Sequence, residues 1–317
     1  MNGALLVLAA TAAAPPQPSP PVAPGQGWSL VWADEFNGSA IDPRNWTLAN
    51  DCWGGGNAER QCYTDRPANA ALKDGMLLIT ARRERFTGPA FPADQRTTPD
   101  KQGQATRAFT SARLATQGKA AWRYGRIEVR ARLPQGQGMW PAIWMLPEDN
   151  RYGAWAASGE IDIMEAVNLG EPCTTGEPGC PAGLEQGILG TLHFGGVWPA
   201  NQHRGATTAM QGALDGFHTY AVEWSPQAIT WLIDGTPFQI QRPGDWFTRG
   251  SATAGAPFDQ RFHLVLNLAV GGRLPEERNK GGVNHKGFPK QMAVDWVHVW
   301  QCADDPASTA RCEASGD

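Results

Sequence analysis

Short runs in which polar and apolar residues alternate, separated by turn residues, are the feature of this chain that most limits its fold. Residues 126–133 alternate strictly and residues 219–224 do much the same, as expected of half-buried strands. Asp234-Gly235 is a strong hairpin signal between the apolar runs 229–233 and 238–240. Further strands are predicted at 75–81, 262–270 and 292–300. Because no segment keeps a helical period, and 37 glycines and 25 prolines divide the chain, the pattern predicts an all-β sandwich or jelly roll of antiparallel sheets.

The two ends of the chain differ from its middle. Residues 5–14 form a short apolar run that ends in small residues, and a Pro-rich stretch follows over 15–24. This order is typical of a secretory signal peptide, but the basic residues that usually precede the apolar run are missing, so a disordered tail is the alternative. We predict a signal peptide and Pro-rich leader over 1–25, one domain over 26–302 and a tail over 303–317. The leader predicts secretion to the extracellular space or the periplasm.

The low charge of the chain narrows the range of partners. Charged residues make up 18% of the sequence, and the net charge is −4. Nucleic acids and anionic membrane surfaces bind basic patches, so neither is expected as a partner. No segment is apolar enough to span a membrane. We expect a monomer.

Six cysteines fall into three local pairs along the chain. None lies in a Cys-x-x-Cys pair, which argues against a zinc site. If the leader directs secretion, disulfides are the natural state of these residues. The simplest of the 15 connectivities joins Cys52 to Cys62, Cys173 to Cys180 and Cys302 to Cys312, but the sequence does not decide among them, and six free thiols are the alternative.

The segment 158–167 carries an unusual row of acidic residues. Glu160 and Asp162 lie two apart, so in a strand they share one face, while Ile161 and Ile163 share the other. Glu165 breaks this alternation. In a regular strand it would be buried beside the isoleucines, which costs several kcal/mol unless the charge is paired or neutralised. The alternative, which we favour, is a β-bulge around Met164 that returns Glu165 to the face of Glu160 and Asp162.

Three carboxyl groups on one strand face suit glycoside hydrolysis. Their mutual repulsion raises at least one pKa, as a general acid at neutral pH requires. Retaining glycosidases use a carboxylate nucleophile and a carboxylic acid about 5–5.5 Å apart, so the side chains of Glu160 and Glu165 would have to lean together. A metal site and a solvated acidic face are the alternatives, although a hard cation requires more oxygen ligands than this strand supplies.

Around this segment the chain resembles glycoside hydrolase family 16, and closely its laminarinase-like endo-β-1,3-glucanases. The motif Glu-x-Asp-x-x-Glu of that family matches Glu160, Asp162 and Glu165, and Met164 is the extra residue that its lichenase branch lacks. Further blocks look like those of the family across nearly the whole mature chain: 32–38, 63–64 with 69, 74–77, 138–146, 191–194 and 267–272. One departure is Ala112, where relatives often have glycine.

The resemblance implies a fold and a set of site residues. The fold would be a concanavalin-like jelly roll with a concave substrate cleft in the domain 26–302. Glu160 would be the nucleophile, Asp162 its assistant and Glu165 the acid/base. Substrate-binding residues in the cleft would be Asn69, Arg113, Trp140, Trp144, Trp155, His193 and Trp198. Tryptophan faces stack on pyranose rings, but most of the 14 tryptophans are expected to fill the core, and His193 alone would be an ordinary structural histidine.

A structural calcium ion is the one metal that the resemblance suggests, and no cofactor is expected for catalysis. Glu35 and Asp295 look like the matching positions, with a carbonyl near Gly75 as a third ligand, although both carboxylates could be plain surface groups.

We predict retaining endo-hydrolysis of β-1,3-glucan or mixed-linkage β-1,3-1,4-glucan, with the polysaccharide as partner. The alternatives are a family 16 hydrolase of a galactan, agar or carrageenan and a non-catalytic glucan-recognition protein on the same fold. Relatives of the last kind usually lack one or both catalytic glutamates, whereas Glu160 and Glu165 are both present.

Overall fold

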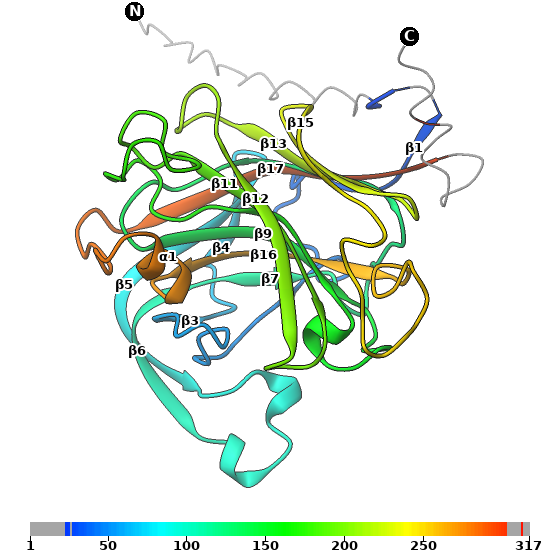
Figure 1. Ribbon diagram of the computed structural model, residues 1–317. Coiled ribbons are helices and arrows are strands. Elements are labelled where there is room, and N and C mark those ends of the chain that lie inside the picture. Colours follow the sequence, from blue (N-terminus) through cyan, green and yellow to red (C-terminus); the bar gives the residue numbers. More distant parts are fainter. Residues whose placement is uncertain (1–22, 26, 303–311, 313–317) are drawn as a thin grey trace, which may run out of the picture.

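A computed structural model of the protein describes residues 23–25, 27–302 and 312, and it consists of two large β-sheets that pack face to face (Figure 1). The predicted leader lies almost wholly outside the described residues, and of the predicted tail only Cys312 is described. Among the described residues, no helix is long and apolar enough to cross a membrane.

The larger sheet has ten strands in the order β15-β14-β13-β8-β17-β5-β6-β3, with β1 paired to β17 and β4 to β5. Its pairs are antiparallel except β3 with β6, which run parallel. The strands are β1 (Trp28–Asp34), β3 (Gln61–Tyr63), β4 (Ala70–Lys73), β5 (Met76–Pro89), β6 (Gln104–Ser111), β8 (Gly125–Arg132), β13 (His218–Trp224), β14 (Ile229–Ile233), β15 (Thr236–Gln241) and β17 (Lys290–Cys302).

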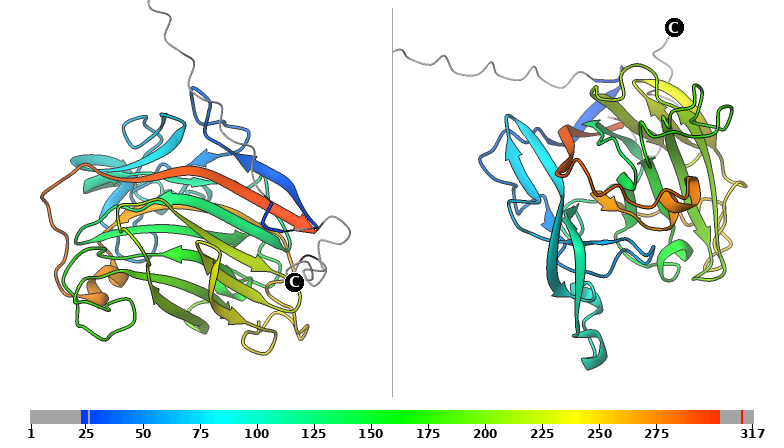
Figure 2. Two further views of the ribbon diagram at one scale, coloured as in Figure 1. Left: turned by 90° about the horizontal axis from the view of Figure 1, so that it is seen from above. Right: turned by 90° about the vertical axis from the view of Figure 1, so that its left-hand side faces the viewer.

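The smaller sheet has seven antiparallel strands in the order β12-β11-β10-β9-β16-β7-β2. They are β2 (Thr47–Leu48), β7 (Arg113–Ala115), β9 (Met139–Pro147), β10 (Glu160–Glu165), β11 (Gly187–Gly195), β12 (Asn201–Ala209) and β16 (Phe262–Val270). The helices are short: α1 (Arg273–Arg278) and the 3₁₀ turns η1 (Ala93–Gln95), η2 (Pro99–Lys101) and η3 (Trp155–Ala157). Figure 2 shows the two sheets from two further directions.

The predicted strands are all present, and the all-β sandwich is confirmed. The alternation of residues 126–133 becomes β8, in which Ile127 and Val129 have no exposed surface. Asp234 and Gly235 both take positive φ, 49° and 75°, as a tight hairpin turn with the twist of its strands requires. The core between the sheets is a single large cluster whose largest members include Trp46, Trp224 and Trp231.

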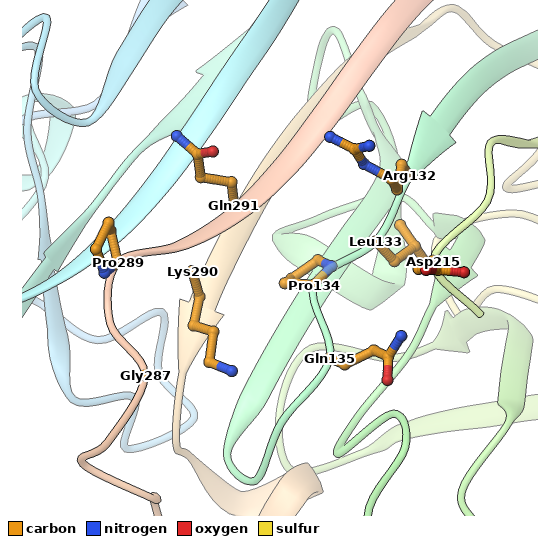
Figure 3. Close-up of a pocket in the computed structure, with 9 residues that line it drawn as sticks. All are labelled: Arg132, Leu133, Pro134, Gln135, Asp215, Gly287, Pro289, Lys290 and Gln291. Carbon is orange, nitrogen blue, oxygen red and sulfur yellow. The ribbon is translucent and has the colours of Figure 1, made fainter.

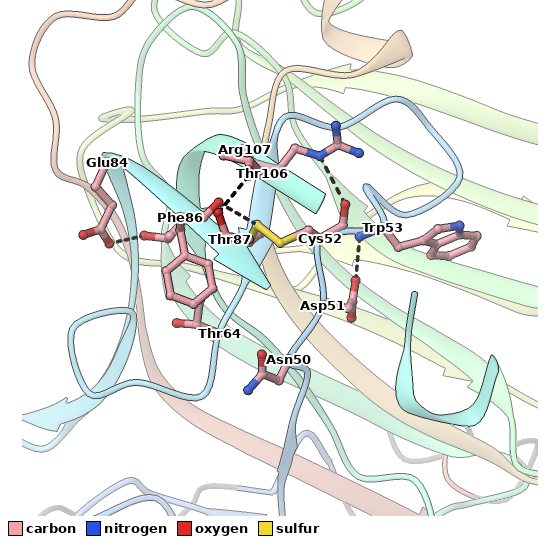
Figure 4. Close-up of a disulfide and its surroundings, with 12 residues drawn as sticks. Asn50, Asp51, Cys52, Trp53, Thr64, Glu84, Phe86, Thr87, Thr106 and Arg107 are labelled. Atoms are coloured by element: carbon pink, nitrogen blue, oxygen red, sulfur yellow. Dashed lines mark hydrogen bonds between the residues drawn. A yellow bond between two sulfur atoms is a disulfide. The ribbon is translucent and has the colours of Figure 1, made fainter. Parts of the chain in front are cut away.

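Two features extend or fasten the sandwich. The hairpin of β5 and β6 reaches beyond its body and carries η1 and η2 at the far end (Figure 1). The three simplest cysteine pairs are all disulfides: Cys52–Cys62, Cys173–Cys180 and Cys302–Cys312. The first lies against the hairpin, where the Cys52 N–H donates to the Pro89 carbonyl and Arg107 Nε donates to the Cys52 carbonyl at 3.1 Å (Figure 4).

Candidate active site

The strand β10 is bulged where the sequence predicts it. Its register shifts between Asp162 and Met164 against β9, and between Asp162 and Glu165 against β11. Ile163 and Met164 are consecutive, yet both are buried in the core between the sheets, at 1% and 0% exposure. The extra residue therefore returns Glu165 to the side of Glu160 and Asp162. We call this face of the seven-stranded sheet, opposite the core, the carboxylate face.

The core holds this bulge from behind. A bulge disrupts the ladder of main-chain hydrogen bonds, and a buried carbonyl needs a new donor. Trp231 on β14, which has no exposed surface, donates its indole N–H to the Asp162 carbonyl at 2.7 Å. Gly190 on β11 makes room for this ring, because a Cβ there would lie 2.4 Å from Trp231 Cδ1. The larger sheet thus fixes the backbone of the acidic segment.

Two tryptophans and a histidine hold the carboxyl groups on the other side. Trp155 Nε1 donates to Glu160 Oε2, and Trp140 Nε1 donates to Glu165 Oε1, both at 2.9 Å. His193 Nε2 lies 3.2 Å from Asp162 Oδ2 and 3.6 Å from Glu160 Oε1. The His193 ring centroid is 5.7 Å from that of Trp155. The structure therefore brings six of the predicted residues together.

Burial and charge set the pKa values of this group. Burial, and then the negative charge of Asp162, raises the pKa of Glu160 to about 7. The same two causes raise the pKa of Glu165 to about 8. Burial opposes protonation of His193, but the charges of Glu160 and Asp162 outweigh it and raise the pKa of His193 to about 10. Near neutral pH the group is therefore a cationic imidazole beside two carboxyl groups that ionise in the range of a general acid and base.

The same residues could instead bind a metal ion. Glu160, Asp162 and His193 offer ligand atoms within 4.8 Å of one another. A histidine binds a metal in its neutral form, and because the pKa of His193 is raised, a metal would have to displace its proton near neutral pH. The arrangement fits proton transfer and nucleophilic attack better than it fits a cation.

A second cluster lies beside the carboxylate row on β7, β9 and β16. Asp162 pairs in register with Trp144, whose ring lies 4.7 Å from Arg113 Cζ. Trp144 Nε1 donates to Asn267 Oδ1 at 2.7 Å. Asn267 in turn bonds Tyr63, whose hydroxyl bonds the buried Glu59. Arg113 and Trp144 are predicted site residues. Glu59, Tyr63 and Asn267 were not predicted as site residues, although Tyr63 and Asn267 lie in segments that carry the family resemblance.

Two predicted substrate-binding residues do not join this group. Asn69 has no exposed surface, and its amide is bonded to Thr64, Thr80 and Thr110 within the protein. Asn69 is instead a structural residue at the base of the β5–β6 hairpin. Trp198 is 73% exposed in the turn between β11 and β12, and no contact among the described residues links its ring to the carboxyl groups.

The residues predicted to bind calcium have other partners. His298 Nε2 lies 2.6 Å from Glu35 Oε1, and Asp295 forms an ion pair with Arg130. Calcium takes about six to eight oxygen ligands. An ion bound by Glu35 and Asp295 would therefore have to displace both partners.

A surface cavity of about 400 Å³ lies away from the carboxyl groups, where β8 ends and β17 begins in the larger sheet (Figure 3). Its lining residues are Arg132, Leu133, Pro134, Gln135, Asp215, Gly287, Pro289, Lys290 and Gln291. No residue of the acidic group and no predicted substrate-binding residue lines it. We therefore place the chemistry on the carboxylate face.

Several known proteins with similar sequences or structures are glucanases, and others are beta-1,3-glucan-binding proteins. A glucan endo-1,3-beta-glucosidase A1 from Niallia circulans is 38% identical over 87% of this chain, which spans only 38% of that longer protein. A glucan endo-1,3-beta-glucosidase from Cryptopygus antarcticus is 42% identical over 86% of this chain and 92% of its own length. The solved laminarinase from Rhodothermus marinus superposes with a TM-score of 0.67 at 38% identity, covering 86% and 97% of the two chains. The model of glycosyl hydrolases family 16 matches residues 66–298, and the chain belongs to that family.

Proposed function

We propose that the protein is a retaining endo-glycosidase that hydrolyses β-1,3-glucan or mixed-linkage β-1,3-1,4-glucan. The observation that carries the proposal is the pair of glutamates that the bulge of β10 brings to one face, Glu160 and the partly buried Glu165, with pKa values raised to about 7 and about 8. The glucanase relatives supply the substrate class. A glucan-recognition protein would not require two carboxyl groups held in this state.

The reaction follows from the positions of the side chains. Ionised Glu160 attacks the anomeric carbon and forms a glycosyl-enzyme, while protonated Glu165 gives its proton to the leaving oxygen. Glu165 then removes a proton from water, which attacks the same carbon and releases Glu160 with overall retention. Trp155 and Trp140 each fix one oxygen of these carboxyl groups. His193⁺ and Asp162 flank the nucleophile and control its charge.

Product analysis tests this proposal directly. The purified protein is incubated side by side with laminarin, barley mixed-linkage glucan, agarose and carrageenan, and the first products are read by NMR. We expect β-anomeric oligosaccharides from one or both glucans and none from the other two polymers. First products with the α-anomer would refute retention, and cleavage of only agarose or carrageenan would refute the substrate class.

Substitution of the nucleophile tests the assignment of roles. Glu160→Gln replaces the attacking oxygen with an amide of the same shape, which cannot form the glycosyl-enzyme. We expect loss of turnover with an unchanged melting temperature and retained glucan binding. Asp149→Asn, at an exposed position outside the group, is the matched control. Activity of Glu160→Gln close to that of the control would contradict the role of nucleophile.

Several properties of the whole protein are part of the same proposal. Family 16 glucanases need no cofactor for catalysis. We propose that residues 26–302 form the catalytic domain, that the leader 1–25 directs secretion, and that the protein works as a monomer. The three disulfides support an oxidising compartment. A structural calcium ion at Glu35 and Asp295 stays a prediction, and chelation with a measurement of Tm tests it.

A further inference from the structure

A hydrogen-bond chain of four side chains leads from the loop before β3 to the carboxylate face. Its members are Glu59, Tyr63, Asn267 and Trp144. Trp144 Nε1 donates to Asn267 Oδ1 at 2.7 Å, and Asn267 Nδ2 donates to Tyr63 Oη at 3.2 Å. Tyr63 Oη donates to Glu59 Oε2 at 3.1 Å. Glu59, Tyr63 and Asn267 are 7%, 4% and 6% exposed, so these bonds are made almost entirely inside the protein.

The chemistry of each group fixes the direction of every bond in this chain. An indole N–H can only donate, so it selects the amide orientation that presents Asn267 Oδ1 to Trp144. The amide nitrogen of Asn267 must then donate to Tyr63. The single hydroxyl proton of Tyr63 is thereby directed to Glu59. Burial raises the pKa of the Tyr63 hydroxyl well above 10, so this group keeps its proton.

The far end of the chain is itself anchored. Gln61 Nε2 donates to Glu59 Oε2 at 2.6 Å, and Gln61 Oε1 accepts from the Val270 N–H at 2.8 Å. Gly55 lies against the carboxylate, since a Cβ there would be 2.1 Å from Glu59 Oε1. The Cys52–Cys62 disulfide bridges the segment that contains Glu59, and β3 pairs with β6 on the hairpin. Glu59 is therefore a fixed acceptor.

The near end of the chain meets the site. Trp144 pairs in register with Asp162, and its indole ring stacks with the Arg113 guanidinium at 4.7 Å. An indole that has lost its acceptor would gain rotational freedom and no longer offer one surface to a sugar ring. We propose that Glu59, Tyr63 and Asn267 are positioning residues, which fix the Trp144 ring so that it and Arg113 form a rigid platform for a glucan residue next to the scissile bond. This inference rests on the proposed function.

Tyr63→Phe is the sharpest test because it removes one oxygen atom from the middle of the chain. Tyr220→Phe is the matched control. The Tyr220 hydroxyl is also buried, in the core, but it makes no hydrogen bond to any described residue. Tyr63→Phe removes both hydrogen bonds of the hydroxyl, from Asn267 and to Glu59. If the loosened Trp144 ring costs the equivalent of one hydrogen bond, a laminari-oligosaccharide should bind roughly five- to tenfold more weakly, measured by calorimetry in a Glu160→Gln background. Tyr220→Phe should change the affinity less than twofold.

A double-mutant cycle separates positioning from general support. Trp144→Phe keeps an aromatic ring but removes the N–H that Asn267 accepts. If Tyr63 acts through Trp144, Tyr63→Phe should have little further effect in the Trp144→Phe background, whereas independent effects would multiply. Multiplying effects, or an affinity loss in Tyr63→Phe no larger than in Tyr220→Phe, would overturn the inference.

A measurement without glucan tests the positioning role independently of the proposed function. The indole N–H resonance of Trp144, identified by its loss in Trp144→Phe, reports the bond to Asn267 directly. We expect Tyr63→Phe to shift it and Tyr220→Phe to leave it in place. An unmoved resonance refutes the positioning role even if the protein cleaves glucan. A wild-type protein that cleaves no β-glucan refutes the proposed function, whatever the resonance does.

Discussion

Replacing Trp231 with phenylalanine should damage both the stability and the activity of this protein, because Trp231 is the donor that holds the bulge of β10. Trp231→Phe leaves the buried Asp162 carbonyl without its 2.7 Å bond, at a cost of about 1–3 kcal/mol. The smaller ring also removes packing worth about 2 kcal/mol in a site with no exposed surface. The free energy of unfolding should fall by roughly 3–5 kcal/mol, which corresponds to a decrease of roughly 10 °C in Tm.

The effect on activity shows whether Trp231 holds the bulge in place or only fills space in the core. If β10 relaxes, Glu165 moves relative to Glu160, and a displacement of about 1 Å can cost roughly 100-fold in rate. Trp224→Phe is the matched control, since Trp224 is equally buried and its Nε1 donates to the Phe258 carbonyl at 3.1 Å. We expect similar losses of Tm by calorimetry but a loss of kcat on laminarin of about tenfold or more only in Trp231→Phe. Equal kcat values for the two variants, measured well below both melting temperatures, would refute this account of the bulge.

Four further outcomes can be checked. Glu165→Ala should lose far more activity on glucan than on an activated aryl glycoside, and azide should rescue it as the β-glycosyl azide; an α-azide would contradict the acid/base role. The wild-type kcat/KM should rise as Glu160 ionises near pH 7 and fall as Glu165 loses its proton near pH 8, as one coupled pair. His193→Gln should move both limbs to higher pH, since the imidazolium charge lowers both pKa values; unmoved limbs would count against a charged His193. Chelation should lower Tm but spare initial rates, and an immediate loss of rate without unfolding would reopen the carboxylate trio as a metal site.

Strand positions could be predicted because alternation is a local property of the sequence. β8, β13 and β14 follow from the period of two and from the turn at Asp234-Gly235. The parallel pairing of β3 with β6 could not be predicted, since β3 has only three residues and all of them are buried. The reach of β5 to Pro89 was also missed, because its outer half is a polar arm without the apolar face that marks a packed strand.

The bulge could be predicted because Glu165 lies an odd number of residues from Glu160, which would place it on the opposite face of a regular strand. The hydrogen bond that stabilises the bulge could not be predicted. A carboxyl group five residues from its partner has only one inexpensive route to the same face. The donor that stabilises this route, Trp231, lies 69 residues along the chain. In the sequence it is one more tryptophan in an alternating strand, and its bond to Asp162 depends on the packing of the two sheets.

Asn69 shows how a residue in a family-like segment can differ from its expected surroundings. It lies in a segment that resembles the family, and a polar residue there was expected to meet the substrate. In the structure its amide joins the loop after β3 to β5 and β6 through Thr80 and Thr110. A family block therefore indicates that a residue matters, but only its surroundings decide whether it binds sugar or supports the fold.

The surroundings of three glutamates, Glu59, Glu160 and Glu165, likewise decide which of them are expected to react. Glu59 and Glu160 are buried and Glu165 is partly buried, and loss of contact with water is the main cause that raises the pKa of each. Their hydrogen-bond donors differ. Glu59 accepts short bonds from Gln61 and Tyr63 on a single oxygen, so it is fixed as the end of a chain. Glu160 and Glu165 each accept only one described hydrogen bond, from an indole N–H, whereas Glu59 accepts two. An oxygen that must attack carbon or carry a proton to a leaving group has to be free of such bonds. The number of donors at each carboxylate therefore distinguishes positioning from reaction, and the order of residues in the chain does not reveal that number.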